Sequence, residues 1–179
     1  MSSRCFTPSP EMRAVDSYRI EPACLADAAL LAAMSQELVE AGLRPSWGRE
    51  RIRAHMRHPE SIVLGARCGG VIAGFAIMRY ADEVAHLNLL AVDPVHRRRG
   101  VGRRLVRWLE ETALTAGTFI IGLELRAENQ GARAFYARLG YRELARIPGY
   151  YQGVEAALRM QRDVRDPHTA APGARRSAP

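Results

Sequence analysis

The sequence contains no lysine, so all 26 of its strongly basic side chains are arginines. It has only three cysteines, and their scattered positions fit neither a disulfide framework nor the spacing of a metal-ligating cluster. None of the five histidines stands in an HExxH or similar pattern, which argues against a zinc site. We therefore expect reduced thiols without a chemical role and no metal.

Long apolar runs are missing as well. No stretch reaches the roughly 18 apolar residues that a membrane span needs, and residues 1–16 lack the apolar core of a signal peptide. We therefore expect a cytoplasmic protein with no membrane partner. The hydrophobic share of 47% is ordinary for a globular chain, and 179 residues suit one domain.

The net charge of +7 raises the question of a nucleic-acid partner. A GC-rich genome alone can give a chain this rich in arginine and alanine, and aromatic side chains for base stacking are sparse among the arginines. The sequence therefore does not favour nucleic acid, and a non-catalytic basic binding module is the weaker alternative. The densest group of arginines comprises Arg97, Arg98, Arg99, Arg103, Arg104 and Arg107.

Two tails flank the predicted domain. Residues 1–16 are polar and show no periodicity, and residues 165–179 form a low-complexity segment rich in proline, alanine and arginine. We expect both tails to be disordered and one folded domain to span residues 17–164. Strands are predicted over Tyr18–Glu21, Ile62–Arg67, Val71–Tyr80, Val84–Val92, Phe119–Leu125, Tyr141–Ile147 and Glu155–Arg162.

Helices are predicted between these strands. The first begins near Asp27 and is expected to end at Gly42, and Ser46 is expected to cap the second. The last two helices are predicted over Gly100–Thr115 and Asn129–Leu139, with Asn129 as the cap of the fourth.

The order of these elements, β-α-α-β-β-β-α-β-α-β-β, indicates a single domain of the mixed α/β or α+β class. We expect a mixed, mostly antiparallel central sheet of about six to seven strands, flanked by about four helices. Because Phe119–Leu125 is almost entirely apolar, it is predicted to be a central strand that is covered on both faces.

The segment Val92–Arg103 joins a strand to a helix and carries two glycines, Gly100 and Gly102, at the start of that helix. The first N–H groups of a helix have no intrahelical partners and carry partial positive charge, and the neighbouring arginines add to that charge. The segment therefore predicts a pyrophosphate site at a helix N-terminus. It is neither a P-loop, since no Gly-Lys-Ser/Thr follows, nor a GxGxxG fingerprint, since Leu105 stands at the third glycine position.

The run Arg97-Arg98-Arg99-Gly100-Val101-Gly102 matches the [QR]-x-x-G-x-[GA] pattern, so the chain resembles the GNAT superfamily of N-acetyltransferases. The resemblance extends over roughly residues 18–164. It implies the GNAT fold and acetyl-CoA as co-substrate, with no metal. It places the pantetheine arm of the coenzyme along Leu90, Ala91 and Val92, and the pyrophosphate against Arg97, Arg98, Arg99, Gly100, Val101, Gly102 and Arg103.

A second motif, LELRAEN from Leu123 to Asn129, followed by AFYARLGY from Ala134 to Tyr141, is similar to the RimI-like branch. Those enzymes acetylate the N-terminal alanine of a ribosomal protein. The similarity continues through Tyr150 and Tyr151, which the resemblance places beside the incoming peptide terminus. The branch has Gly-Glu-Asp-Ala after the tyrosines, whereas Val154 here takes the place of the first acid and leaves the substrate-end contacts open.

Glu124 is a carboxylate on an otherwise apolar strand, where its burial is costly unless it is paired or functional. The resemblance makes it the base that accepts the amine proton through water. The alternative is a structural salt bridge with Arg126 or Arg146. His86 lies on the strand before the loop and could reach a wall of the site, but the favoured interpretation is an ordinary surface or core histidine.

Tyr136 lies one turn before Gly140, and the resemblance makes it the acid that protonates the coenzyme sulfur. A phenol with an ordinary pKa of about 10 is protonated and able to donate at neutral pH. The alternative is a core aromatic side chain, as we expect for Phe135. The resemblance also gives Asn129 a contact to the coenzyme.

The sequence therefore predicts an acetyl-CoA-dependent N-acetyltransferase that acts on a primary amine. A protein or peptide N-terminal α-amine is the favoured acceptor, with a lysine side chain as the close relative. The alternative acceptor is a small amine such as a polyamine, an amino acid or an antibiotic. The sequence gives no indication of the oligomeric state.

Overall fold

The computed structural model describes residues 18–81 and 83–166. The predicted tail over residues 1–16 lies outside these residues, as does the tail over 165–179 except for Arg165 and Asp166, which follow the last strand in a turn. None of the described helices has both the length and the apolar character that crossing a membrane takes.

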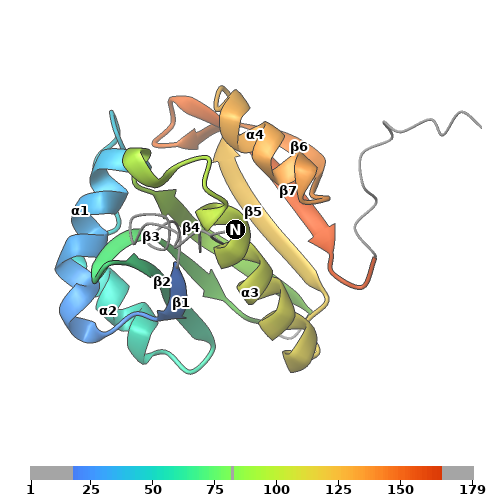
Figure 1. The fold of residues 1–179 in the computed structure, drawn as a ribbon. Helices are drawn as coiled ribbons and strands as arrows, with labels where there is room; N and C mark the ends of the chain where they lie inside the picture. The colour runs from blue at the N-terminus through green and yellow to red at the C-terminus, as the bar shows by residue number, and fades with distance from the viewer. Residues whose placement is uncertain (1–17, 82, 167–179) are drawn as a thin grey trace, which may run out of the picture.

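Seven strands form one sheet in the order β1-β2-β3-β4-β5-β7-β6 (Figure 1). Neighbouring strands are antiparallel except β4 and β5, which are parallel. The predicted mixed, mostly antiparallel sheet is therefore confirmed. The strands are β1 (Arg19–Pro22), β2 (Ser61–Cys68), β3 (Val71–Arg79), β4 (Val84–Val92), β5 (Ile120–Arg126), β6 (Arg142–Tyr151) and β7 (Glu155–Asp163).

The helices cover the two faces of the sheet (Figure 1). On one face, α1 and α2 contribute Leu31 and Ile52 to a core that also contains Phe75 from β3. On the other face, α3 and α4 pack over a second core that includes Leu105 and Leu123. The helices are α1 (Ala28–Leu38), α2 (Arg49–Arg57), α3 (Val101–Ala116) and α4 (Gln130–Arg138), with short 3-10 turns η2 (Leu25–Asp27) and η3 (Pro94–His96).

A bulge in β4 changes which face its side chains reach. Leu89 pairs with Ile77 and Leu87 pairs with Met78, so that Asn88 is the extra residue of β4. Leu87 packs into the core beneath α3, whereas Leu89 packs into the core beneath α1. The bulge therefore turns the second half of β4 relative to its first half.

The predictions for the start of α2 and the end of α1 are wrong. α1 ends at Leu38, before Gly42, and the residue that precedes α2 is Gly48. The reason is Glu40, a buried carboxylate that accepts hydrogen bonds from both the backbone N–H and the hydroxyl of Ser46, each at 2.6 Å. Ser46 thus holds the α1–α2 loop closed instead of capping the second helix.

The expectation that β5 is covered on both faces is also wrong. Its residues alternate between buried and half-buried, with Ile121, Leu123 and Leu125 inside the core under α3 and α4. Glu124 belongs to the alternating, half-buried set. Because side chains alternate across a strand, the polar residue of this strand lies on the less covered face.

Candidate active site

The strands β4 and β5 form a fork. They pair only at Val84–Ile120, Ala85–Ile121 and His86–Gly122, and they separate toward their C-terminal ends (Figure 1). β4 continues to pair with β3 as far as Val92, and β5 continues to pair with β7 as far as Arg126. One edge of Leu87–Val92 is therefore left without a strand partner in the described structure, and its backbone groups can pair with an extended ligand.

The apex of the fork contains a polar atom that lacks a partner. The side-chain oxygen Oδ1 of Asn88 is buried and has no hydrogen-bond partner among the described residues. A buried acceptor of this kind is costly when it stays unsatisfied. A ligand with an N–H group, inserted into the fork, would fit such an acceptor. Leu90, Ala91 and Val92 follow on the same strand, as the predicted pantetheine contact requires.

The loop between β4 and α3 has the backbone of an anion site. Asp93 accepts a hydrogen bond from the Val95 N–H at 2.9 Å, which fixes the turn after the strand. Arg98 and Gly100 both have positive φ, +62° and +79°, and Gly100 is the residue before α3. The first intrahelical hydrogen bond runs from the Arg104 N–H to the Gly100 carbonyl, so the amides of residues 101–103 precede it.

The two glycines of this loop have different functions. At Gly100 a side chain would meet no atom within 4 Å, and the left-handed backbone is what favours glycine. At Gly102 an added Cβ would lie 3.3 Å from Cζ of Phe135 and 3.6 Å from Cγ2 of Val92. Gly102 therefore allows α3 to begin close to α4 and to the end of β4. Arg97, Arg98, Arg99 and Arg103 are exposed around this start, and Arg97 Nε donates to the Val92 carbonyl.

Glu124 lies at the base of the fork and is bound from three sides. Its Oε2 is 3.0 Å from His86 Nε2 on β4, and its Oε1 accepts from Arg159 Nε on β7 at 2.7 Å. The Tyr150 hydroxyl on β6 donates to Oε2 at 3.4 Å. The Glu124 side chain is only 7% exposed, whereas those of His86 and Arg159 are 40% and 48% exposed.

These partners stabilise the ionised carboxylate. The hydrogen bond from His86 has the largest effect on the pKa of Glu124 and, together with Arg159, lowers it from 4.5 to about 2, although burial acts in the opposite direction. The sequence suggested Arg126 or Arg146 as a salt-bridge partner of Glu124, and this prediction is wrong. Nε of Arg126 lies 3.5 Å from Oε2 of Glu155, and Nη2 of Arg146 lies 2.9 Å from Oε1 of Glu128.

Tyr136 lies on α4 and is buried in the core beneath this helix. Its ring meets those of Phe135 and Tyr141 edge to face, with centroids 5.0 and 5.4 Å apart. Burial raises the pKa of Tyr136 well above its ordinary value, and the Tyr151 phenol acts in the same direction. The Tyr136 phenol therefore remains protonated at neutral pH and has a proton to donate. Asn129, as predicted, caps α4 by accepting from the Ala132 N–H at 3.0 Å.

Tyr150 and Tyr151 end β6 in the last hairpin, where their rings meet at 5.0 Å. Burial raises the pKa of Tyr151 to about 12, with Tyr150 and Glu124 adding to the effect. The structure thus places Tyr150 in contact with Glu124, and Tyr151 against Tyr150.

The hairpin is joined to the α1–α2 loop across this face. The Gln152 side chain accepts from the Arg44 N–H at 3.1 Å and donates to the Arg44 carbonyl at 2.9 Å. Arg126 on β5 also reaches the loop, where it donates to the Ala41 carbonyl at 2.7 Å. Two loops far apart in sequence therefore form a wall beside Glu124.

The sequence did not identify two members of the Glu124 cluster. His86 was expected to be an ordinary histidine, and Arg159 was not singled out. Arg159 stands directly opposite Glu124 in the antiparallel register of β5 and β7, where opposite charges stabilise the pair. Arg159 could be assigned to Glu124 only once the pairing of β5 with β7 was known.

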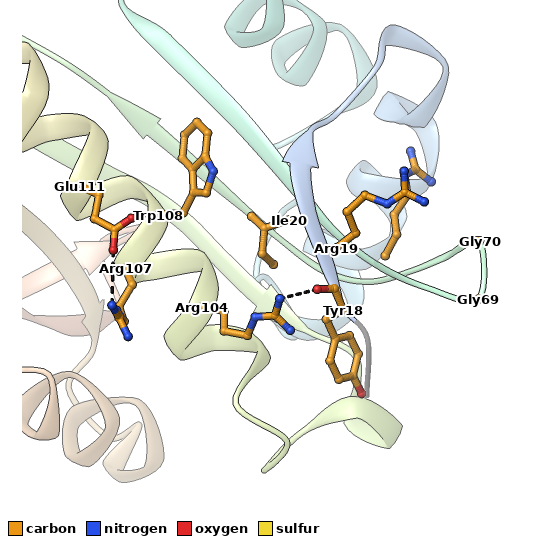
Figure 2. Close-up of a pocket in the computed structure, with 10 residues that line it drawn as sticks. Tyr18, Arg19, Ile20, Gly69, Gly70, Arg104, Arg107, Trp108 and Glu111 are labelled. Carbon is orange, nitrogen blue, oxygen red and sulfur yellow. Dashed lines mark hydrogen bonds and ion pairs between the residues drawn. The ribbon is translucent and has the colours of Figure 1, made fainter. Parts of the chain in front are cut away.

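A separate groove of about 730 Å³ lies on the other side of α3, between that helix and β1 (Figure 2). Arg104 and Arg107 of the dense arginine group belong to this groove and not to the fork. Arg104 donates to the Tyr18 carbonyl, and Arg107 pairs with Glu111 at 3.4 Å. The arginine group is therefore divided between two sides of α3.

Residues 29–141 match the acetyltransferase (GNAT) family model. The chain is 31% identical over 126 residues to the N-alpha-acetyltransferase RimI of Mycobacterium tuberculosis, an alignment that covers 68% of this chain and 78% of that protein.

Two solved structures share the fold. The crystal structure of the ribosomal-protein-S18-alanine N-acetyltransferase from Escherichia coli superposes with a TM-score of 0.71 at 26% identity, over 88% of this chain and 99% of that one. The structure of YncA from Salmonella typhimurium, solved with its cofactor acetyl-CoA, gives a TM-score of 0.69 at 20% identity, over 89% and 100%. The predicted fold and the RimI-like resemblance are confirmed.

Proposed function

The chain belongs to the GNAT family of acetyltransferases, and we propose that it transfers the acetyl group of acetyl-CoA to the α-amine at the N-terminus of a protein. The fork between β4 and β5 carries this proposal, because it leaves a free strand edge that leads from the start of α3 to the Glu124 cluster. The named acceptor of the Escherichia coli relative, a ribosomal protein, supports a protein terminus as the acceptor and the cytoplasm as the place of action.

Three groups of residues would hold the coenzyme. The free edge at Leu90, Ala91 and Val92 offers backbone groups to the amides of the pantetheine arm, with the Val92 carbonyl also accepting from Arg97 Nε. The backbone amides and side chains of residues 97–103 offer positive charge to the pyrophosphate. Asn129 caps α4, which directly follows β5, and Tyr136 lies in the last part of that helix.

Acetyl-CoA supplies a thioester, whose carbonyl carbon accepts the amine and whose thiolate leaves. The acceptor ammonium must lose two protons in all, one before the attack and one from the nitrogen after it, and the leaving sulfur must gain one. Glu124 supplies the negative charge at the site of proton removal and is held there by His86, Arg159 and Tyr150. Tyr136 delivers the proton to the sulfur, since its buried phenol is protonated at neutral pH, and the second proton from the nitrogen restores the phenol.

The acceptor would enter on the face of the sheet that carries α1 and α2. Tyr150 and Tyr151 form its wall on one side, and the α1–α2 loop, tied to the hairpin through Gln152 and Arg44, forms the other. A wall made by two loops suits an extended peptide terminus, because it lets backbone and side chains contact both sides. The Glu124 carboxylate attracts the ammonium group at the end of such a peptide.

A panel of acceptors tests this proposal. Purified protein and acetyl-CoA are incubated with lysine-free peptides that begin with Ala, Ser or Met, with a lysine peptide whose N-terminus is blocked, and with a polyamine. We expect acetylation of at least one free α-amine, located by tandem mass spectrometry on the first residue, at a kcat/KM above that of the blocked lysine peptide. Turnover of the polyamine alone would contradict the proposal.

A further inference from the structure

The Glu124 cluster contains a histidine whose second ring nitrogen is not engaged by the carboxylate. From this arrangement we infer that His86 is the group that takes the proton from the acceptor amine, and that Glu124 is a positioning residue that orients and stabilises His86. The inference rests on the proposed function, since it assigns the proton-accepting atom within the same site.

The geometry fixes the tautomer of His86. An ionised carboxylate only accepts hydrogen bonds, so the 3.0 Å contact between His86 Nε2 and Glu124 Oε2 requires the hydrogen on Nε2. The other ring nitrogen, Nδ1, then carries a lone pair whenever the imidazole is neutral. Glu124 itself cannot turn to another partner, because Arg159 holds Oε1 at 2.7 Å.

Glu124 is poorly suited to take the proton directly. The hydrogen bond from His86, with help from Arg159, lowers the pKa of this carboxyl to about 2, so ionised Glu124 has little affinity for a proton at neutral pH. An α-amine has an ordinary pKa of about 8, and an imidazole one of about 6.5, which makes an imidazole a far closer match. A carboxylate with three donors is better suited to stabilise a positive charge beside it.

His86 is also the accessible member of the pair. Its side chain is 40% exposed, against 7% for Glu124. Its neighbour across the parallel strands is Gly122, and a Cβ built there would lie 4.0 Å from His86 Nδ1. The lack of a side chain at this position leaves space beside Nδ1, on the same face as the acceptor wall.

The charged and titratable groups near His86 come from four strands: Arg79 stands opposite it in the register of β3 and β4, and the others lie on β5, β7 and β6. Glu124 on β5 binds its Nε2, while Arg159 on β7 and Tyr150 on β6 contact Glu124 from the other side. In the proton transfer, one N–H bond of the acceptor ammonium breaks and an Nδ1–H bond forms. The electron pair stays on the amine nitrogen, which is then neutral, and Glu124 compensates the charge of the imidazolium. Solvent removes this proton after each turnover.

Chemical rescue tests the assignment. Turnover is measured for the wild type, His86→Ala, His86→Gln, Glu124→Gln and the control His58→Ala, which removes an exposed histidine outside the site. All variants are first compared by thermal melting and by coenzyme binding. We expect His86→Ala to lower kcat about 100-fold or more with the KM for acetyl-CoA nearly unchanged. Added imidazole should restore at least about a tenth of the lost rate in His86→Ala, but none in Glu124→Gln.

The outcomes separate the inference from the proposed function. If the wild type acetylates no α-amine, the proposed function is overturned together with the inference. If the wild type is active and His86→Ala or a folded His86→Gln keeps kcat within about threefold, the inference alone is overturned. A loss in His86→Ala that imidazole does not restore also overturns it, because it would show a structural role.

Discussion

The ion pairs and hydrogen bonds of Glu124 predict how the free energy of unfolding depends on pH. Its pKa falls from 4.5 to about 2 on folding, and each tenfold change in an acid constant corresponds to about 1.4 kcal/mol. About 3 kcal/mol of the free energy of unfolding is therefore tied to the ionised carboxylate. Because the Glu124 side chain is only 7% exposed, solvent does little to weaken these interactions.

The sign of the pH dependence follows from the direction of the pKa change. A carboxyl whose pKa is lowered on folding contributes its full stabilisation above pH 4.5, and loses it as the pH falls toward about 2. More than half of the contribution should be lost by about pH 3. Glu124→Gln lacks the titrating group, so its stability should decrease less over this range.

Urea unfolding, followed through the fluorescence of the buried Trp47, measures this difference. At neutral pH the wild type should be more stable than Glu124→Gln by about 3 kcal/mol, and the gap should shrink by about 2 kcal/mol by about pH 3. Glu143→Gln is the control, because Glu143 pairs with Arg133 near the surface. A gap between wild type and Glu124→Gln that does not change with pH would refute the geometry described for the carboxylate.

Three further predictions concern α3 and α4. Tyr136→Phe should lower kcat about 100-fold without weakening coenzyme binding, as measured by steady-state kinetics and thermal shift, and an unchanged kcat would leave Tyr136 only a packing role. Asn129→Ala removes the hydrogen bond to the Ala132 N–H and should lower the free energy of unfolding by about 1 kcal/mol; a change below about 0.3 kcal/mol would contradict the cap. Gly100→Ala forces a side chain into a left-handed backbone, so it should lower the free energy of unfolding by about 1 kcal/mol and weaken coenzyme binding. The control is Gly69→Ala in the β2–β3 turn, which also has positive φ and should lower the free energy of unfolding without weakening coenzyme binding.

Much of the fold followed from local patterns in the chain. The strand from Val84 to Val92 was predicted with the bounds that the structure has, because apolar residues fill it and Asp93-Pro94 ends it. The cap at Asn129 was also predictable, because an asparagine directly before a helix commonly accepts a hydrogen bond from one of the first free N–H groups of that helix.

The errors arose where distant residues determine local structure. Ser46 was a reasonable helix cap by sequence, but the buried carboxylate of Glu40 binds it instead. The apolar composition of β5 suggested that helices cover both of its faces. In the structure, the face of β5 on the α1 and α2 side is less covered than the face on the α3 side. Neither the hydrogen bonds of Glu40 nor the uneven covering of β5 produces a periodic pattern in the sequence.

The sequence predicted several residues of the candidate site, but it did not predict which of them contact one another. The motif located the loop, Glu124 and Tyr136, but the partners of Glu124 depend on the strand order. His86 comes from the parallel neighbour and Arg159 from the antiparallel neighbour of the same strand. Only the sheet topology shows that these side chains converge on one carboxylate.

Hydrogen exchange at the fork tests the central claim most directly, because it reports where the coenzyme lies. Exchange of backbone amides is compared with and without coenzyme A for segments that cover β4, the start of α3, and the groove at β1 and α3. We predict slower exchange over Leu87–Val92, where one edge of β4 faces the fork, and over residues 101–103 at the start of α3, with no change in Arg19–Pro22. Protection of the groove at Tyr18 and Trp108, with the fork unaffected, would contradict the account.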